Sequence, residues 1–284
     1  MKFLRFEYNN DVKLGLLTEN GTIQDLNSIL SKLKIPEIFH MRDFIEYYKR
    51  NNKDLQNLFQ QASKQQGQYK IGEVKLKAPV IPLKMIYLGL NYVDHANETG
   101  KKLPKNPMLF SKAVSALNDP YGNIILPSKF VDYEVELGIV IGKKCKNVTP
   151  EESLEHVFGY TIINDVTERK VQMSDGQFFR GKSYDTFAPI GPYIVTDIDP
   201  SNLELELQLN GEIMQKSNTK NLIFSVQKII SFISEGMTLM PGDIIGTGTP
   251  PGVGVARNPP VFLKSGDKLE LSIENIGILI NHVI

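Results

Sequence analysis

A chain of 284 residues that is 41% hydrophobic and 23% charged has the composition of an ordinary globular protein. Lys plus Arg and Asp plus Glu each count 32, so the formal net charge is zero, which argues against nucleic acid or a membrane surface as the main partner. The single cysteine excludes a disulfide framework and a cysteine-rich zinc site. Because the sequence shows neither a signal peptide nor an apolar run of ~18 residues, we expect a cytoplasmic protein.

The first 70 residues predict a small α+β domain. Apolar residues on both sides of Glu19-Asn20-Gly21 are typical of a hairpin. Residues 41–66 repeat apolar side chains at helical intervals, which predicts one or two helices. A polar stretch at residues 64–70 then marks the expected boundary, so we expect one domain over residues 1–70 and a second over residues 71–284.

A buried strand is predicted at residues 85–90, and the polar stretch after it contains His95 and Glu98. In a helical turn these two side chains, at i and i+3, share a face, so the carboxylate can orient the imidazole. The segment could be a mobile lid carrying a general base, but the pair alone favours an exposed loop. Lys112 could reach an anionic substrate, although most lysines lie in solvent.

Acidic residues interrupt the strand pattern of residues 132–142, DYEVELGIVIG. At period two the odd-numbered positions form an apolar face, and Asp132, Glu134 and Glu136 lie together on the other. The Cβ atoms of neighbouring acids would be roughly 6.5 to 7 Å apart, so their carboxylates repel each other unless a positive charge intervenes. A hard cation such as Mg²⁺, Mn²⁺ or Ca²⁺ explains the pattern, and a solvated strand face explains it about equally well.

A second strand is predicted at residues 159–167, with Asp165 at its far end. A third carboxylate at a strand end would complete a site for a metal held by two glutamates, although Asp is also a common turn or capping residue. A helix should begin at Glu168 and break at Ser174-Asp175-Gly176. Lys182 follows between Gly and Ser, but the spacing of a phosphate loop is absent.

The last third of the chain predicts a hairpin around Asn210-Gly211, a helix over residues 225–236 and a closing hairpin. Between them, a strand at residues 243–249 leads into PPGVG. Tandem prolines remove the backbone donors that a phosphate cradle needs. We therefore expect a rigid loop that holds Thr247 and Thr249 close to a ligand, or else a purely architectural turn.

Six segments occur in the order GLNYVDHANE, FSK, DYEVELGIVIG, NDVTER, GKSYDTFAPIGP and GTGTPPGVG. Through them the chain from about residue 85 to 284 resembles the fumarylacetoacetate hydrolase family, and within it the bacterial branch of acylpyruvase-like diketo-acid hydrolases. The resemblance implies an α+β, mainly β fold, a fumarylacetoacetase C-terminal-like roll of mixed sheets, and a homodimer. Residues 1–70 match only the habit of some bacterial members of carrying a small N-terminal α+β domain.

The same resemblance assigns roles to residues of this sequence. It implies Mg²⁺ or Mn²⁺ as the cofactor, with Ca²⁺ as a possible substitute in crystals. It makes Glu134, Glu136 and Asp165 the metal ligands, His95 and Glu98 a lid dyad, Gln172 and Lys182 neighbours of the substrate, and Thr249 the residue that binds the substrate carboxylate. Asn91 stands near a position where longer members have a further acidic ligand, which implies three protein ligands here.

The activity implied is hydrolysis of a carbon–carbon bond in a 2,4-dioxo acid such as an acylpyruvate, giving pyruvate and a carboxylic acid. The metal would act as a Lewis acid, Lys182 would stabilise the developing enolate, and His95 with Glu98 would activate water. Decarboxylation of oxaloacetate or a related β-oxo acid, or an isomerase or lyase reaction, could use the same site. A non-catalytic binding protein of the same fold is the alternative from another class. Arg180 could recognise a second carboxylate or simply lie at the surface.

Overall fold

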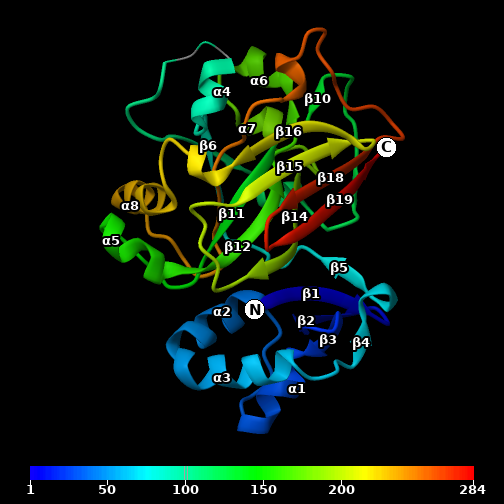
Figure 1. Cartoon of the computed structure of the whole chain (residues 1–284), viewed down its shortest axis with the longest axis vertical. Coiled ribbons are helices and arrows are strands. Elements are labelled where there is room, and N and C mark those ends of the chain that lie inside the picture. Colours follow the sequence, from blue (N-terminus) through cyan, green and yellow to red (C-terminus); the bar gives the residue numbers. More distant parts are fainter. Residues whose placement is uncertain (99, 101) are drawn as a thin grey trace.

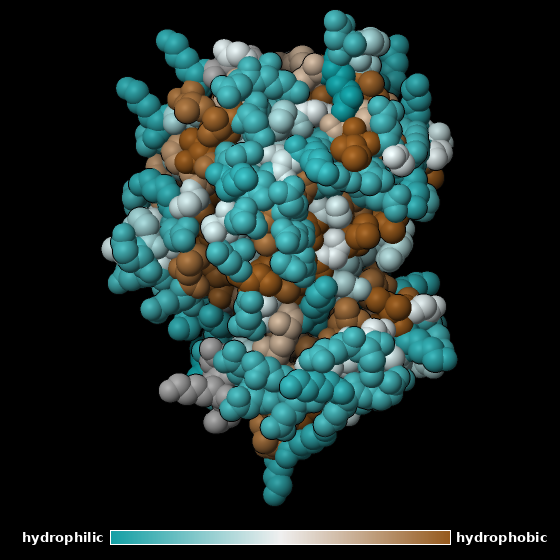
Figure 2. Space-filling view, in the orientation of Figure 1, coloured by the Kyte–Doolittle hydropathy of each residue, from teal (hydrophilic) through white to brown (hydrophobic). Residues whose placement is uncertain are grey.

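The computed structural model describes residues 1–98, 100 and 102–284 (Figure 1). Its α-helices are α1 (Leu26–Leu30), α2 (Met41–Arg50), α3 (Asn52–Ser63), α4 (Val93–Glu98), α5 (Pro150–Ser153), α6 (Arg169–Asp175), α7 (Phe179–Lys182) and α8 (Val226–Gly236). Single 3₁₀ turns lie at Ser31–Leu33, Ile71–Glu73, Val114–Ala116, Leu154–His156, Thr219–Asn221 and Gly254–Ala256. None of the described helices is both long and apolar enough to cross a membrane. Figure 2 shows hydrophilic residues over much of the face in view, with hydrophobic residues in separate groups between them.

The largest sheet has twelve strands. Its main path runs through β4 (Tyr69–Lys70), β3 (Thr22–Asp25), β2 (Asp11–Leu17), β1 (Lys2–Tyr8), β14 (Ala188–Val195), β12 (Val157–Asn164), β11 (Val135–Ile141), β17 (Ile244–Gly246), β6 (Met85–Gly89) and β7 (Met108–Lys112). β5 (Lys75–Lys77) also pairs with β1, and β8 (Leu117–Asn118) pairs with β14. Most neighbours are antiparallel, but β17 and β6 are parallel, so the sheet is mixed.

A second sheet has five strands in the order β16 (Glu212–Asn218), β15 (Glu204–Leu209), β18 (Lys268–Ile273), β19 (Gly277–Val283) and β9 (Asn123–Ile124). A short pair joins β10 (Val131–Asp132) to β13 (Thr167–Glu168). The two larger sheets pack through a continuous apolar core, to which the leucines of β15 contribute. The predicted α+β, mainly β fold of mixed sheets is therefore confirmed.

The N-terminal segment contains the predicted hairpin, formed by β2 and β3, and the predicted helices α2 and α3. Its strand β1 pairs with β14, so the large sheet continues from this segment into the rest of the molecule. Phe3 and Phe44 pack against Phe158 of β12, with ring centroids 5.5 and 6.3 Å apart. A domain boundary near residue 70 stays a prediction. In Figure 1 this segment lies at the opposite end of the molecule from α4, α6 and α7.

The single strand predicted for residues 132–142 is wrong in one respect, because it is divided between β10 and β11. Asp132 ends β10, and its Oδ1 accepts hydrogen bonds from the backbone N–H groups of Tyr133 and Gly254, both at 2.8 Å. The N–H of Glu134 is bound by the Asn164 side chain at 3.1 Å instead of by a strand partner. Contacts with distant residues therefore interrupt the strand at Tyr133 and Glu134, and β11 begins before Glu136.

Most of the remaining predicted elements agree with the structure, but the strand predicted at residues 243–249 is only β17 (Ile244–Gly246), and the one predicted at residues 159–167 ends at Asn164. β15 and β16 turn at Asn210 and Gly211, which both have positive φ angles of 54° and 84°. Helix α8 begins after Ser225, whose hydroxyl accepts a hydrogen bond from the N–H of Lys228. Helix α6 ends at Gly176 in the left-handed conformation, as the predicted break requires. The short helix α7, which carries Lys182, was not predicted.

Candidate active site

Three buried carboxylates converge where β11 and β12 meet. Glu134 and Glu136 lie two residues apart and project to the same side, as their period predicts. Antiparallel pairing sets Val135 opposite Asn164, so Asp165 lies beside Glu134 and its N–H donates to the Glu134 carbonyl at 2.8 Å. One oxygen from each carboxylate lies within 4.8 Å of the others. All three residues are at most 7% exposed, so the interpretation as a solvated strand face is wrong.

Cations surround two of these three acids. Lys182 Nζ lies 2.5 Å from Asp165 Oδ2 and 3.1 Å from Glu134 Oε2, and its third bond goes to Thr167 Oγ1 at 2.9 Å. Arg169 lies 2.6 Å from Glu134 Oε1 on the other side. Burial alone would raise the pKa of Glu134, but these two positive charges outweigh burial and lower it to about 2. Glu134 is therefore ionised.

Glu136 is the acid that these cations compensate least, because the charge of Lys182 is outweighed there. Burial, followed by the negative charges of Asp165 and Glu134, raises the pKa of Glu136 well above its usual value. Its Oε2 accepts a hydrogen bond from the Gly248 N–H at 3.0 Å. Its Oε1 is buried and has no hydrogen-bond partner among the described residues. A divalent cation would provide a partner for this oxygen, and the three carboxylates offer the hard oxygen ligands that such a cation prefers. These residues therefore fit a divalent cation.

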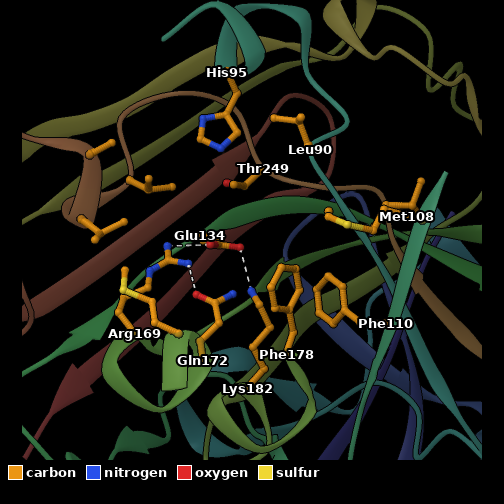
Figure 3. A pocket seen from close by; sticks show the side chains of 16 residues that line it. Leu90, His95, Met108, Phe110, Glu134, Arg169, Gln172, Phe178, Lys182 and Thr249 are labelled. Carbon is orange, nitrogen blue, oxygen red and sulfur yellow. Dashed lines mark hydrogen bonds and ion pairs between the residues drawn. The ribbon is translucent and has the colours of Figure 1, made fainter. Parts of the chain in front are cut away.

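A cavity of about 320 Å³ opens next to the acids (Figure 3). Its walls come from the start of α4, from β6 and β7, from α6 and α7, and from the loop after β17. Of the predicted site residues, five line it: His95, Glu134, Gln172, Lys182 and Thr249. Glu136 and Asp165 lie behind Glu134, at 1% and 0% exposure. The structure thus brings the predicted metal ligands and most of the predicted substrate neighbours to one place.

His95 and Glu98 lie on one face of α4, so the helical turn is correct and the exposed loop that the pair alone favoured is not. The Nδ1 atom of His95 is 3.0 Å from Glu98 Oε2. The other oxygen of Glu98 accepts a hydrogen bond from the Gly252 N–H at 3.1 Å. The carboxylate therefore orients the imidazole and at the same time ties α4 to the PPGVG loop. Figure 3 shows the imidazole ring pointing into the cavity, toward Thr249 and Glu134.

Lys112 has a different environment from that expected of a substrate-binding residue. Its Nζ is fully enclosed and donates to Asp165 Oδ1 at 2.6 Å and to the carbonyls of Val166 and Phe187 at 3.0 and 2.6 Å. Burial lowers its pKa to about 8, although the charge of Asp165 opposes this. All three donors of an ammonium are used, and Lys112 is not among the residues lining the cavity. The geometry favours a positioning role for Lys112, which holds Asp165 in place.

Asn91 braces the backbone near the site. Its amide nitrogen donates to the Thr247 and Phe224 carbonyls at 2.8 and 3.2 Å, and its oxygen accepts from the Phe224 N–H at 2.8 Å. The side chain is therefore occupied by backbone groups on both sides. This arrangement agrees with a set of three protein ligands.

Two residues of the site, Arg169 and Gln215, were not singled out from the sequence. Arg169 binds Asp132 Oδ2 through both Nε and NH2, each at 2.8 Å, and donates to Gln172 Oε1 at 3.1 Å. The i, i+3 spacing of Arg169 and Gln172 on a predicted helix was the available signal. Gln215 of β16 donates to Thr249 Oγ1 at 2.9 Å and accepts from the Val135 N–H at 2.9 Å. Nothing in its local sequence indicates this contact.

Comparison with known proteins agrees with the fold and the site. Residues 84–284 match the model of the family described as "Fumarylacetoacetate (FAA) hydrolase C-terminal". The matched region contains all the site residues discussed above, including the three acids. The chain therefore belongs to the fumarylacetoacetate hydrolase family, as its six ordered motifs predicted.

Similar proteins with described activities are enzymes of this family, which supports an enzymatic role. A 2,4-didehydro-3-deoxy-L-rhamnonate hydrolase of Sphingomonas sp. is 41% identical and covers 98% of this chain and 94% of its own. A mitochondrial oxaloacetate tautomerase of Rattus norvegicus is 48% identical and covers 75% of this chain and 70% of its own. The solved fumarylacetoacetate hydrolase of Exiguobacterium antarcticum has a TM-score of 0.84 at 37% identity, covering 100% of this chain and 99% of its own.

Proposed function

We propose that the chain is a divalent-metal-dependent hydrolase that cleaves a carbon–carbon bond in a 2,4-dioxo acid of the acylpyruvate type. The products would be pyruvate and a carboxylic acid. The observation that carries the proposal is the convergence of three buried carboxylates beside a cavity that also contains the His95–Glu98 pair. The similarity to a hydrolase of a didehydro-deoxy sugar acid over almost the whole chain supports it.

Glu134, Glu136 and Asp165 would hold the cation, and an all-oxygen set favours Mg²⁺ or Mn²⁺ over softer metals. When bound, such an ion supplies Lewis-acid polarisation of the 2-oxo group and stabilises negative charge in the enolate that leaves. Lys182 lies beside Glu134 at the floor of the cavity, so its positive charge acts at short range on a developing enolate oxygen. Gln172 and Thr249 lie where they can contact the polar end of the substrate.

The dyad would perform the proton transfers. A carboxylate accepts but does not donate, so Nδ1 of His95 carries the proton shared with Glu98 and Nε2 is the basic nitrogen. Nε2 takes a proton from water, whose oxygen then bonds to the distal carbonyl carbon. The bond between that carbon and C3 breaks, and its electron pair enters the pyruvate enolate. Nε2 then returns its proton to C3 of the enolate, which completes pyruvate, while the attacked carbonyl carbon, now bearing the water oxygen, becomes the second carboxylic acid.

Tautomerisation is a second candidate, favoured by the 48% identity to proteins described as oxaloacetate tautomerases. The same residues could move a proton between C3 and an enol oxygen without attack by water. Decarboxylation of oxaloacetate, or another isomerase or lyase reaction, would likewise need the enolate but no hydrolytic water. The proposal retains two further expectations from the sequence, a homodimer and a cytoplasmic location. A non-catalytic binding protein remains the alternative outside enzymes.

The test is a turnover screen with Mg²⁺ of acylpyruvates, fumarylpyruvate, oxaloacetate and sugar-derived diketo acids, followed by product analysis. Pyruvate with an equal amount of a second carboxylic acid supports hydrolysis. Pyruvate with CO₂ indicates a decarboxylase, and enol–keto interconversion without cleavage indicates a tautomerase. Calorimetric titration with Mg²⁺ and Mn²⁺ then separates enzyme from binding protein, since a chain that binds neither ion and turns over no substrate would have lost the chemistry.

A further inference from the structure

The cavity walls that lie away from the acids are apolar. Figure 3 shows Met108, Phe110 and Phe178 together on one side of Glu134. The rings of Phe110 and Phe178 pack edge to face with centroids 5.4 Å apart, which fixes this wall. Further apolar lining comes from Leu88, Leu90, Met173, Val253, Val255 and Ala256. The site therefore combines a polar floor with walls that offer mainly hydrophobic contact.

The permanent cations that line the cavity in the described part of the chain are Arg169 and Lys182. Arg169 is bidentate with Asp132, at 2.8 Å from both Nε and NH2, so its charge is neutralised from behind the cavity. Lys182 directs its donors to Glu134, Asp165 and Thr167 at the floor. Neither side chain is placed to receive a carboxylate at the walls.

Arg180, which could have recognised a second carboxylate, lies elsewhere. Its side chain is 61% exposed and forms an ion pair with Asp175 through two nitrogens. It is not among the residues that line the cavity. A carboxylate at the distal end of a substrate would therefore leave water for an apolar wall at which the described residues offer no cation. Such a transfer of a charged group is strongly unfavourable.

The volume sets the size of the distal group. At about 320 Å³ the cavity is at the small end of the range for ligand pockets. Since a water molecule takes up roughly 30 Å³ in the liquid, the cavity has room for roughly ten non-hydrogen atoms of a ligand. A dioxo acid of about five to seven carbons fits that space, which leaves room for an acyl group of about two to four carbons. The N-terminal segment lies at the other end of the molecule and adds nothing to these walls within one chain (Figure 1).

We propose that this site selects acylpyruvates whose acyl group is short, uncharged and largely apolar, and rejects those with a distal carboxylate. This inference rests on the proposed hydrolase function and names its substrate class. Met173 of α6 and Phe178 before α7 are the specificity-determining residues of the wall. The polar floor binds the part of the substrate that all 2,4-dioxo acids share, and the walls discriminate between their distal groups.

Butanoylpyruvate and succinylpyruvate provide a matched test, because they differ only by a terminal methyl group in place of a carboxylate. With Mg²⁺ present, kcat/KM should be about 100-fold higher for butanoylpyruvate, the cost expected for burying an unpaired charge. Equal or faster cleavage of succinylpyruvate would overturn the inference but leave the hydrolase proposal standing. If neither compound is cleaved, the proposed function fails. Calorimetric binding of the two compounds then tests the inference separately. Tighter binding of butanoylpyruvate would support the selectivity, and equal binding would overturn it.

A charge placed on the wall gives a second readout. Met173 lines the cavity but is 68% exposed, so Met173→Arg should fold and should raise kcat/KM for succinylpyruvate about fivefold, as a partly exposed ion pair can. Phe179→Arg is the control, because Phe179 is 43% exposed and does not line the cavity. If the preference for butanoylpyruvate over succinylpyruvate is unchanged in Met173→Arg, or changes equally in both variants, Met173 does not determine specificity.

Discussion

Gly246 of β17 leaves the space that Glu136 occupies, and replacing it with alanine should weaken metal binding. A Cβ atom added at Gly246 would lie 2.4 Å from Glu136 Oε2 and 2.4 Å from Cδ1 of Tyr87. Tyr87 is fully buried and stacks on Phe110, so its ring cannot easily retreat. Gly246 has no positive φ angle, so the substitution adds no backbone strain. Both side chains must therefore shift, and the displacement of Glu136 is the one that affects the metal site.

The displacement can be sized from these contacts. Real Cβ atoms essentially never approach another heavy atom closer than 3.0 Å, so the carboxylate must shift by ~0.6 Å or rotate away from Gly248. Misplacement of this order in a ligand or its support typically costs 10-fold to 100-fold in metal affinity. We expect Gly246→Ala to bind Mn²⁺ about 10-fold to 100-fold more weakly than the natural protein, measured by isothermal titration calorimetry.

Gly236 provides the matched control. It is the last residue of α8, and a Cβ atom there would meet nothing within 4 Å. Gly236→Ala should therefore bind Mn²⁺ as the natural protein does. Thermal unfolding of both variants would verify that they fold. If Gly246→Ala is folded and its Mn²⁺ affinity is unchanged, Glu136 is not a ligand and the reasoning from the acid cluster is refuted.

Three further predictions concern the buried ion pairs, the His95–Glu98 pair and Cys145. Arg169→Leu removes one of the buried ion-pair partners of Glu134. The free energy of unfolding, measured by urea denaturation, should therefore fall by about 3 kcal/mol or more. A loss below about 1 kcal/mol would argue against a stabilising ion pair between Arg169 and Glu134. His95→Ala should lower turnover by about 10²-fold to 10⁴-fold, while its affinity for Mn²⁺ persists. Full activity in this variant would reject the role of His95 as general base. Glu98→Gln should retain more activity than His95→Ala, because the imidazole is still present. Burial raises the pKa of the Cys145 thiol to about 11, so labelling by a thiol reagent should stay slow at pH 8. Because the unfolded thiol ionises first, Cys145 should contribute stability below about pH 9 that is lost as the pH rises through 11, and Cys145→Ala should lack this component of the pH dependence.

The sequence pattern was sufficient for elements determined by local chemistry. Asn210 and Gly211 form a hairpin turn because both can adopt positive φ angles, and Ser225 begins a helix because its hydroxyl can cap the first turn. The division of the acidic strand was not predictable in this way. It depends on Asp132 binding the N–H of Gly254, a residue more than a hundred positions away. Tertiary contacts of this kind override a local strand pattern.

The site shows the same limit. Period two placed Glu134 and Glu136 on one face, but only the register of β11 with β12 brings Asp165 beside them. Lys112 was expected at the substrate because a lysine usually seeks solvent or an anion. Its actual partners include the carbonyl of Phe187, which no local pattern indicates. The ordered motifs therefore identified the family and the acids, whereas the division of roles among the buried cations required the fold.

The most direct test of the central claim is product analysis of acetylpyruvate turnover with Mg²⁺ and after chelation of the metal. The account predicts equal amounts of pyruvate and acetate with Mg²⁺, almost none after chelation, and recovery when Mg²⁺ or Mn²⁺ is restored. Enol–keto interconversion without release of acetate, or cleavage that is unchanged after complete removal of the metal, would contradict a metal-dependent hydrolase built on Glu134, Glu136 and Asp165.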